Sequence, residues 1–404
     1  MSKVWLHIIG LDESEIVEFS LLESAKNILG TKRLLDRLPK KYQQKTQLFK
    51  TPFKALIEQV LALRGEQIII LASGDANWFG IGASLISHLD FDEYETYPSL
   101  SAFQLAASKL HWALQNTDCI SLHGRSVGRK VENLHKYLFP KNRILALTSD
   151  KNTLYEVASL LEQRGYENSS LNILENLGAK NERIISFKAH EAIRQKIGDF
   201  YVLAIDCVAN ESAPLLPNIA GLPDEAYICD GQLTKREVRA ITLAKLAPYP
   251  NAILWDIGAG CGSIGIEFMR SARNAKAICF ERNEKRIAYI EQNKLALGVP
   301  DLEIIAGEAL ENITDQIQPD VIFLGGEVAN VALLESCLRA LKIGGRIVAN
   351  AVSLGGQQAL LERYKNYGGE LIKIDIARAK QNGKISLFEP KKTIMQWSFI
   401  KGQK

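Results

Sequence analysis

The sequence predicts an α/β protein with two domains in one chain of 404 residues. In both halves, short runs rich in β-branched residues alternate with helix-length amphipathic segments, which is typical of α/β folds. Residues 208–223 lose this periodicity and contain three prolines, as expected of a connector. The length also corresponds to about two or three domains. We therefore place one domain at residues 1–207, a linker at 208–222 and a second domain at 223–404.

The first half has six β-rich runs that we predict to be strands. They cover residues 4–9, 68–72, 119–122, 143–147, 171–174 and 200–205. Between the fourth run (143–147) and the fifth (171–174), Leu154, Val157 and Leu161 recur at helical spacing. Thr153 and Glu156 have the spacing of a capping box. The pattern predicts a helix that begins near Thr153 and ends before Gly165.

The second half has five further β-rich runs. They cover residues 252–257, 276–281, 302–305, 320–324 and 346–350. Helix-length segments separate them, which predicts a Rossmann-like, doubly wound sheet. From Leu371 onward the chain has eight Lys or Arg and two Asp or Glu, a net charge of +6. We interpret this stretch as a basic C-terminal tail.

The composition excludes several classes of protein. With 47% hydrophobic and 24% charged residues, the chain is neither disordered nor of low complexity. A net charge of +3 is too small for a surface that attracts nucleic acid throughout. No apolar run reaches the roughly 18 residues of a membrane helix, and we expect no signal peptide. The six cysteines form no CxxC pair, so we expect reduced thiols, no metal site and a cytoplasmic location.

A glycine-rich turn is the strongest chemical feature. The predicted strand 253–257 enters a loop with Gly258, Gly260 and Gly262, and a helix follows at 264–271. Such a loop lets the backbone approach a ligand, and a helix N-terminus offers N–H groups. We therefore expect a nucleotide-like cofactor. A dinucleotide fingerprint needs glycine or alanine where Ser263 stands, so NAD is disfavoured.

The spacing Asp-x-Gly-x-Gly-x-Gly, which begins at Asp256, resembles the first motif of class I S-adenosylmethionine-dependent methyltransferases. The resemblance implies that the loop faces the methionine part of the cofactor. An acidic residue at the end of the next strand can accept hydrogen bonds from the ribose hydroxyls, and the third strand end usually contacts adenine. Thr234 and Glu237 also have capping-box spacing, so a helix cap and a cofactor contact both stay open for Thr234. The predicted cofactor-binding residues of this half are Thr234, Gly258, Ala259, Gly260, Cys261, Gly262, Glu281, Gly307, Glu308 and Ala309.

Longer segments carry a more specific resemblance. Residues 221–226, 230–239, 254–264, 323–326, 348–352 and 396–397 resemble the decarboxylating methyltransferase domain of corrin biosynthesis. The first half resembles the tetrapyrrole methylase family through Ser-Gly-Asp at 73–75 and through residues 79–82, 98–103, 121–125, 177–178 and 182–183. In this order, the two halves are similar to the decarboxylating precorrin-6Y C(5,15)-methyltransferase family. The resemblance implies a tetrapyrrole methylase-like α/β domain followed by a class I methyltransferase domain.

This resemblance also implies an activity. The first half would methylate carbon 5 of a precorrin, and the second would methylate carbon 15 and remove carbon dioxide from the ring C acetate, in cobalamin biosynthesis. Both halves would bind S-adenosylmethionine, and the chain would form a homo-oligomer without a nucleic-acid or membrane partner. In the first half, the implied cofactor-binding residues are Gly74, Asp75, Gly80 and Ser101.

The carboxylates of a precorrin predict lysine and arginine anchors. The candidates in the second half are Lys235, Arg236, Arg239 and Arg378, and those in the first half are His123 and Arg125, just past a predicted strand. A solvated or structural role is the alternative for each of them. Methyl transfer to an electron-rich carbon needs placement rather than a protein nucleophile, so we assign no catalytic residue.

Two alternative functions stay open. The second half could methylate RNA or another small molecule, which a basic tail would serve, although its charges lack interleaved aromatic residues. The first half could be a binding module that only presents the substrate. That alternative is motivated by Gly10-Leu-Asp-Glu-Ser14, where the family has a Gly-Pro-rich loop, and by Ala76 in place of proline.

Overall fold

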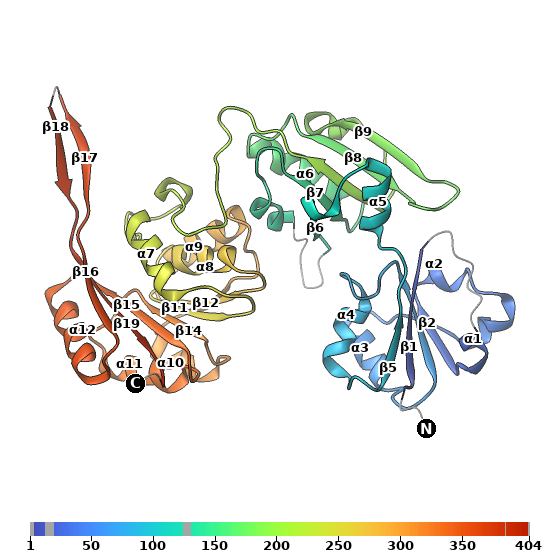
Figure 1. The fold of residues 1–404 in the computed structure, drawn as a ribbon, viewed down its shortest axis with the longest axis horizontal. Coiled ribbons are helices and arrows are strands. Elements are labelled where there is room, and N and C mark those ends of the chain that lie inside the picture. The colour runs from blue at the N-terminus through green and yellow to red at the C-terminus, as the bar shows by residue number, and fades with distance from the viewer. Residues whose placement is uncertain (1–3, 13–19, 124–130, 384, 403–404) are drawn as a thin grey trace. The chain divides into compact units, whose positions relative to one another are not determined.

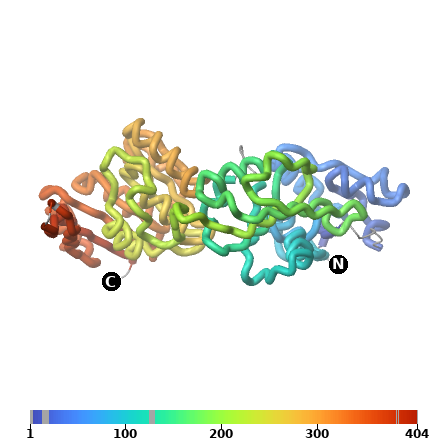
Figure 2. Tube along the Cα trace, turned by 90° about the horizontal axis from the view of Figure 1, so that it is seen from above, coloured from blue at the N-terminus to red at the C-terminus, as the bar shows by residue number. Residues whose placement is uncertain are grey.

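The computed structural model describes residues 4–12, 20–123, 131–383 and 385–402. Two compact units form, one of residues 1–131 and 137–214 and one of residues 132–136 and 215–404 (Figure 1). Figure 2 follows the same chain as a Cα trace. The segment 207–223 contains no helix or strand, and the predicted domain limits stay a prediction. None of the described helices is long and apolar enough to cross a membrane.

The first unit begins with a fully parallel sheet of order β3-β2-β4-β1-β5. Its strands are β1 (Leu6–Leu11), β2 (Asn27–Gly30), β3 (Thr46–Leu48), β4 (Ile68–Ser73) and β5 (Tyr94–Tyr97). The helices are α1 (Leu21–Ser24), α2 (Lys32–Leu35), α3 (Phe53–Leu61) and α4 (Ile81–Leu85), with 3-10 turns at Lys40–Lys45 and Ile86–His88.

Strand β4 shows why this sheet forms. Ile68 and Ile70 pack with α3 on one face, whereas Ile69 and Leu71 pack with α1 and α2 on the other. A strand covered on both faces reads as a continuous apolar run rather than an alternating one. The strand predicted at 68–72 is therefore confirmed, and the same burial explains β1.

The second sheet of this unit has the order β6-β7-β10-β8-β9. Only β6 and β7 pair in parallel, and the other neighbours are antiparallel. Its strands are β6 (Asp118–Ser121), β7 (Arg143–Leu147), β8 (Ser170–Glu175), β9 (Arg183–Lys188) and β10 (Tyr201–Asp206). The helices are α5 (Ala102–Leu110) and α6 (Asn152–Gln163), with 3-10 turns at Leu114–Asn116 and Ala189–Arg194, while the 3-10 turn Val131–Lys136 belongs mostly to the second unit.

Helix α6 corrects one predicted cap. The helix lies where its apolar spacing predicts, but Thr153 is inside it and fully buried. Asp150 instead accepts hydrogen bonds through Oδ1 from the backbone N–H groups of Asn152 (2.8 Å) and Thr153 (3.2 Å). Asp is as good a capping residue as Thr, and here it lies at the helix start.

The second unit is a doubly wound sheet of order β13-β12-β11-β14-β15-β19-β16, so the predicted fold class is confirmed. Only β19 runs antiparallel to its neighbours. Its strands are β11 (Ile253–Ile257), β12 (Lys276–Glu281), β13 (Glu303–Ala306), β14 (Val321–Leu324), β15 (Arg346–Ala351), β16 (Glu370–Ile374) and β19 (Ile394–Ile400). Helices α7 (Arg236–Leu246), α8 (Ser263–Ser271) and α9 (Glu284–Ala296) share one apolar core with the sheet. The other core contains residues of α10 (Ala309–Asn312), α11 (Val331–Ala340) and α12 (Leu354–Tyr367).

The basic stretch after Leu371 is not a tail. It completes β16, forms an antiparallel ribbon of β17 (Ala377–Asn382) and β18 (Ile385–Pro390), and returns as β19, between β15 and the edge strand β16. The ribbon extends beyond the sheet in Figure 1. The prediction was wrong because the stretch contains paired strands: β19 has no charged residue and buries Gln396 and Trp397, whereas the charged residues lie on other segments, such as β17.

Candidate functional site

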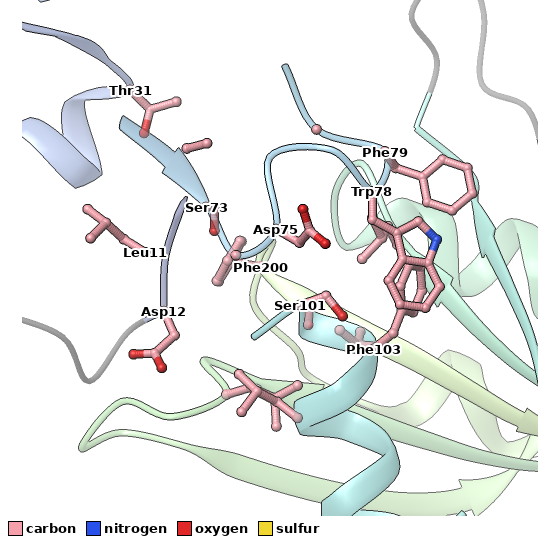
Figure 3. A pocket seen from close by; sticks show the side chains of 18 of the residues that line it. Leu11, Asp12, Thr31, Ser73, Asp75, Trp78, Phe79, Ser101, Phe103 and Phe200 are labelled. Atoms are coloured by element: carbon pink, nitrogen blue, oxygen red, sulfur yellow. The ribbon is translucent and has the colours of Figure 1, made fainter. Parts of the chain in front are cut away.

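A cavity of about 500 Å³ in the first unit collects most of the residues predicted for that half (Figure 3). Its walls come from both sheets, chiefly from the ends of β1 and β4, the start of α5 and the residues around β7, β8 and β10. The predicted residues Gly74, Asp75, Gly80, Ser101 and His123 all line it. Arg125 lies outside the described residues.

Close backbone contacts shape this cavity. Gly74 has φ of +62°, and its N–H donates a 2.6 Å hydrogen bond to the carbonyl oxygen of Leu11. A Cβ atom at Gly10 would collide with the carbonyl oxygen of Gly74, and a Cβ atom at Gly80 would collide with Ala76. Only glycine fits at such positions. The turn after β4 therefore depends on Gly74 and Gly80 and also on Gly10, which precedes them by 64 and 70 residues, so these positions form no single contiguous motif.

Asp75 and Ser101 both make local hydrogen bonds. The Asp75 carboxylate accepts from the backbone N–H of Asn77 at 2.8 Å, which is an Asx turn. Ser101 is the N-cap of α5, because its hydroxyl accepts from the Gln104 N–H at 3.2 Å. Figure 3 shows Asp75 between Ser73 and the aromatic group of Trp78, Phe79 and Phe103. A structural role thus accompanies any binding role of these two residues.

Five residues of this wall were not predicted as site residues: Trp78, Phe79, Phe103, Arg33 and Phe200. Trp78 and Phe79 lie 4.9 Å and 5.9 Å from Phe103, ring centroid to centroid. Arg33, on α2, donates through one Nη to the Ser73 hydroxyl at 3.0 Å and lies 4.2 Å from the ring centroid of Phe200. Burial, and to a smaller extent the charge of Arg37, lowers the pKa of Arg33. A prediction of strand β2 would have placed Arg33 at a strand end, but that strand was not predicted.

His123 lies at the cavity with an exposed side chain. Its Nδ1 is 3.1 Å from the Ser149 hydroxyl oxygen, which also lines the cavity. In the parts of the chain that the structure describes, no group of His, Cys, Asp and Glu is arranged to hold a metal ion.

The glycine loop of the second unit has the predicted strand-loop-helix geometry. Gly258, Gly260 and Gly262 have φ of +70°, +62° and +80°, and α8 begins directly after them. A Cβ atom at Gly258 would lie 3.2 Å from the backbone nitrogen of Gly326, and one at Gly262 would lie 3.0 Å from Ile290. Cys261 has a buried side chain, so only its backbone can face a ligand.

Glu281 joins this loop to the next strand end. Its Oε2 accepts from the Gly260 N–H at 2.8 Å, and its Oε1 accepts from the Asn283 N–H at 2.9 Å. The Gly307 N–H donates to the Glu281 carbonyl at 3.1 Å, which places the predicted adenine segment beside it. In that segment Ala309 is buried and Glu308 forms an ion pair with Arg282 at 2.9 Å.

Asp256, at the end of β11, holds the first turn of α8 in place. The side chain is fully buried, and its Oδ2 accepts from the Gly265 N–H at 3.0 Å. Burial raises the pKa of Asp256 from its ordinary value of 3.8 to about 7. The Asp256 carboxylate, which begins the glycine motif, thus positions the backbone of α8 and is not available to a ligand.

Arg239 is a correction to the predicted substrate anchors. Its side chain is 0% exposed, and its Nε donates to Glu267 Oε1 at 2.6 Å. Glu267 also accepts from the N–H groups of Gly221 (2.6 Å) and Leu222 (3.0 Å) and from the Tyr227 hydroxyl (2.8 Å). An arginine enclosed in this way cannot reach a substrate carboxylate. It fastens the segment 221–239 to α8 instead.

The capping box predicted at Thr234 is also wrong. Helix α7 begins at Arg236 with Lys235 at the N-cap position, and Thr234 offers its carbonyl oxygen to Arg239. The neighbouring Gln232 carbonyl oxygen would lie 3.6 Å from a Cβ atom at Gly260. The segment that contains Thr234 therefore runs close to the glycine loop, which leaves the cofactor contact as its predicted role.

The other predicted anchors differ in how they are engaged. Lys235 is exposed. Arg236 donates through Nε to the Gly221 carbonyl at 2.7 Å. Arg378, on β17, forms an ion pair with Glu237 at 2.6 Å and lies 3.7 Å from Asp224. A carboxylate ligand would have to compete with those two acidic side chains for Arg378.

A buried polar cluster at the end of β15 was not predicted as a feature of the site. The Gln396 amide donates to the Thr242 hydroxyl at 3.0 Å and to the Asn350 side-chain oxygen at 2.9 Å. The Asn350 amide also donates to Thr242 at 2.9 Å. The cluster links α7 to β15 and β19. Its hydrogen bonds offset the cost of burying these polar side chains.

Comparison with known families covers both halves. The family described as "Precorrin methyltransferase domain" matches residues 225–401, and the family described as "Tetrapyrrole (Corrin/Porphyrin) Methylases" matches residues 18–193. A Precorrin-6Y C(5,15)-methyltransferase (decarboxylating) of Sinorhizobium sp is 38% identical over 98% of this chain and 97% of its own length. The protein of that name from Mycobacterium tuberculosis is 34% identical over 95% of both chains.

A shorter relative matches the second half alone. A probable cobalt-precorrin-6B C(15)-methyltransferase (decarboxylating) of Pyrobaculum aerophilum is 30% identical over 42% of this chain and 90% of its own length. Both halves and their order are therefore shared with the full-length relatives. This chain belongs to the family of the decarboxylating precorrin-6Y C(5,15)-methyltransferases.

Proposed function

We propose that this protein transfers methyl groups from S-adenosylmethionine to carbons 5 and 15 of a precorrin and releases carbon dioxide from the ring C acetate. The observation that carries the proposal is the match of 38% identity over 98% of the chain to a relative named for this reaction. Two features support it: the first unit has a cavity of about 500 Å³, and the second unit has a loop whose positive-φ positions are glycines.

The second unit offers the groups that a nucleoside with an amino-acid end would need. The loop from Gly258 to Gly262 would accept the methionine part, because its backbone has no side chain in the way. Glu281 would accept hydrogen bonds from the ribose hydroxyls, and Gly307 and Glu308 would flank the adenine. Thr234 would close the same site from the segment that runs beside Gly260.

In the first unit, Gly74, Asp75, Gly80 and Ser101 would hold a second cofactor molecule in the cavity. When bound, S-adenosylmethionine supplies an electrophilic methyl group on a sulfonium sulfur. The chain's task is to hold the acceptor carbon in line with that group and to exclude water. The aromatic wall of Trp78, Phe79 and Phe103 suits both tasks, since its rings pack against one another and form a broad apolar surface.

No protein nucleophile is required in this scheme. The carboxylates of the macrocycle would be held by cations such as Lys235 and Arg236, and the conjugated ring itself can take up the electron pair released by decarboxylation. Both units therefore contribute mainly by placement and charge.

Calorimetric titration with S-adenosylmethionine tests the proposal. The wild-type chain is expected to bind two molecules, and Gly260→Arg is expected to bind one, because the new side chain fills the second-unit site. Gly344→Arg is the matched control, since Gly344 also has a positive φ of +80° but nothing lies within 4 Å of its Cβ position. If the wild-type chain binds one molecule and Gly260→Arg binds none, the first half is a substrate-binding module. If the wild-type chain binds no S-adenosylmethionine, the proposal is refuted.

A further inference from the structure

The first-unit cavity is lined by a cationic side chain, that of Arg33, which the sequence motifs did not predict as a site residue. Among the described residues that line it, Arg33 is the one lysine or arginine. We propose that Arg33 binds a carboxylate of the ligand in this cavity, with Phe200 and Ser73 holding its guanidinium in place. This inference rests on the proposed function of the first half, because both proposed ligands, the precorrin and S-adenosylmethionine, carry carboxylates.

The surroundings of Arg33 orient its guanidinium. The Cζ atom lies 4.2 Å from the centroid of the Phe200 ring, which is a cation–π contact, and one Nη donates to the Ser73 hydroxyl at 3.0 Å. Its neighbours Leu34 and Leu35 are buried in the core, so the backbone that carries Arg33 is anchored. A guanidinium held in a plane can present its N–H fork to a carboxylate in a bidentate manner.

The charge around Arg33 also favours an anionic ligand at this position. Burial and the charge of Arg37 both lower the pKa of Arg33, although a guanidinium stays charged at neutral pH. The negative charge of a carboxylate that binds here would offset both effects, because it stabilises the charged guanidinium. The wall also contains Asp12, Asp75 and Asp199, whose negative charges would repel a ligand carboxylate. Arg33 would therefore fix which end of the ligand enters which part of the cavity.

Three variants test the inference in the full chain with Gly260→Arg, so that only the first-unit cofactor site remains. Arg33→Met removes the charge and keeps an apolar stem, whereas Arg33→Lys keeps the charge without the planar fork. Lys32→Met is the matched control, because Lys32 is an exposed cation on the same helix that does not line the cavity. The probes are precorrin-6Y, S-adenosylmethionine and 5′-methylthioadenosine, which lacks the amino-acid carboxylate.

Arg33→Met is expected to weaken binding of one carboxylate ligand on the order of tenfold, as for other charge-assisted hydrogen bonds. If the carboxylate belongs to the macrocycle, precorrin-6Y binding falls and S-adenosylmethionine binding does not. If it belongs to the cofactor, S-adenosylmethionine binding falls while 5′-methylthioadenosine binding is unchanged. Arg33→Lys is expected to recover part of the loss in either case, and thermal unfolding checks that each variant is folded.

Equal binding of precorrin-6Y and of S-adenosylmethionine by Arg33→Met and Lys32→Met would overturn the inference. So would a loss of 5′-methylthioadenosine binding as large as that of S-adenosylmethionine. Failure of the proposed function looks different, because Gly260→Arg alone would then bind no S-adenosylmethionine. In that case precorrin-6Y binding, followed by its absorbance, still decides the role of Arg33.

Discussion

The two halves build their candidate sites in different ways. In the second unit, the glycine loop and Glu281 lie within 24 residues of one another and are joined by a direct hydrogen bond between Gly260 and Glu281. In the first unit, the cavity wall combines residues from Leu11 to Val202. A site made from one strand-loop-helix unit can be recognised from a short sequence motif, whereas a site made by the packing of distant segments cannot. Changes in the second unit should therefore act locally, and those in the first should be distributed.

The largest expected effect breaks the support of the second site. Glu267→Leu leaves Arg239 buried without its main partner, which should lower the free energy of unfolding of the second unit by about 3–5 kcal/mol. Urea unfolding followed in the second unit measures it. Glu237→Leu is the control, because its ion pair with Arg378 is exposed and should contribute less than about 1 kcal/mol. A similar loss in both variants would contradict the structural role given to Arg239.

A second change separates the two cofactor sites. Gly258→Val puts a β-branched residue at φ of +70°, with its Cβ atom 3.2 Å from the Gly326 nitrogen. Strain of about 1–3 kcal/mol should weaken S-adenosylmethionine binding at the second site by about tenfold or more and leave the first site unchanged. Calorimetry measures both sites. Gly344→Val has the same φ penalty in open space, so weaker binding there too would show that strain alone, rather than the loop, is responsible.

Glu281→Gln sharpens the comparison at a single side chain. The amide keeps one oxygen for the Gly260 N–H but loses the charge that would accept from the ribose hydroxyls. Hydrogen bonds to charged groups contribute about 1.5–3 kcal/mol, so affinity at the second site should fall by about tenfold or more. Glu284→Gln, in the exposed first turn of α9, is the control. Unchanged affinity in Glu281→Gln would remove Glu281 from the cofactor site.

The smallest expected effect concerns pH and the second unit alone. Because burial raises the pKa of Asp256 from 3.8 to about 7, the folded unit favours the protonated acid. Its contribution to stability is complete below about pH 4 and is lost as pH rises to about 7. Between pH 6 and 8 the loss should be about 1 kcal/mol, measured as the difference between the wild-type chain and Asp256→Asn in urea unfolding. Parallel pH profiles of the two proteins would contradict the raised pKa.

The sequence predicted what depends on local pattern. Strand β4, the loop from Gly258 to Gly262 and Glu281 each follow from a contiguous run, because a strand, a tight turn and a strand end are local structures. It did not predict Arg33 at a cavity, since Arg33 reaches Phe200 only through packing across 167 positions. It also placed Arg239 among the ligand anchors, because nothing in its neighbours along the chain shows that Glu267 encloses it.

The C-terminal stretch shows the same limit, because its charge led to a wrong prediction about strands whose partners are distant in sequence. Its charge suggested a tail, yet Gln396 and Trp397 lie on the strand between β15 and β16. Burial of a single strand of that kind depends on its partners, which are 46 positions away for Gln396 and Asn350. The charges that suggested a tail lie outside β19, which has no charged residue, so the net charge of the stretch gave no sign of this buried strand.

The enclosed pair of Arg239 and Glu267 has a consequence for how this protein can change over evolutionary time. Either residue alone cannot be replaced without leaving an opposite charge in the core, whereas an apolar pair of similar volume is often tolerated. The two positions, 28 residues apart in sequence, should therefore be inherited as one unit. Among relatives of this chain, we expect descendants to keep both charges or neither, with Leu222 and Tyr227 adapting to whichever pair is present.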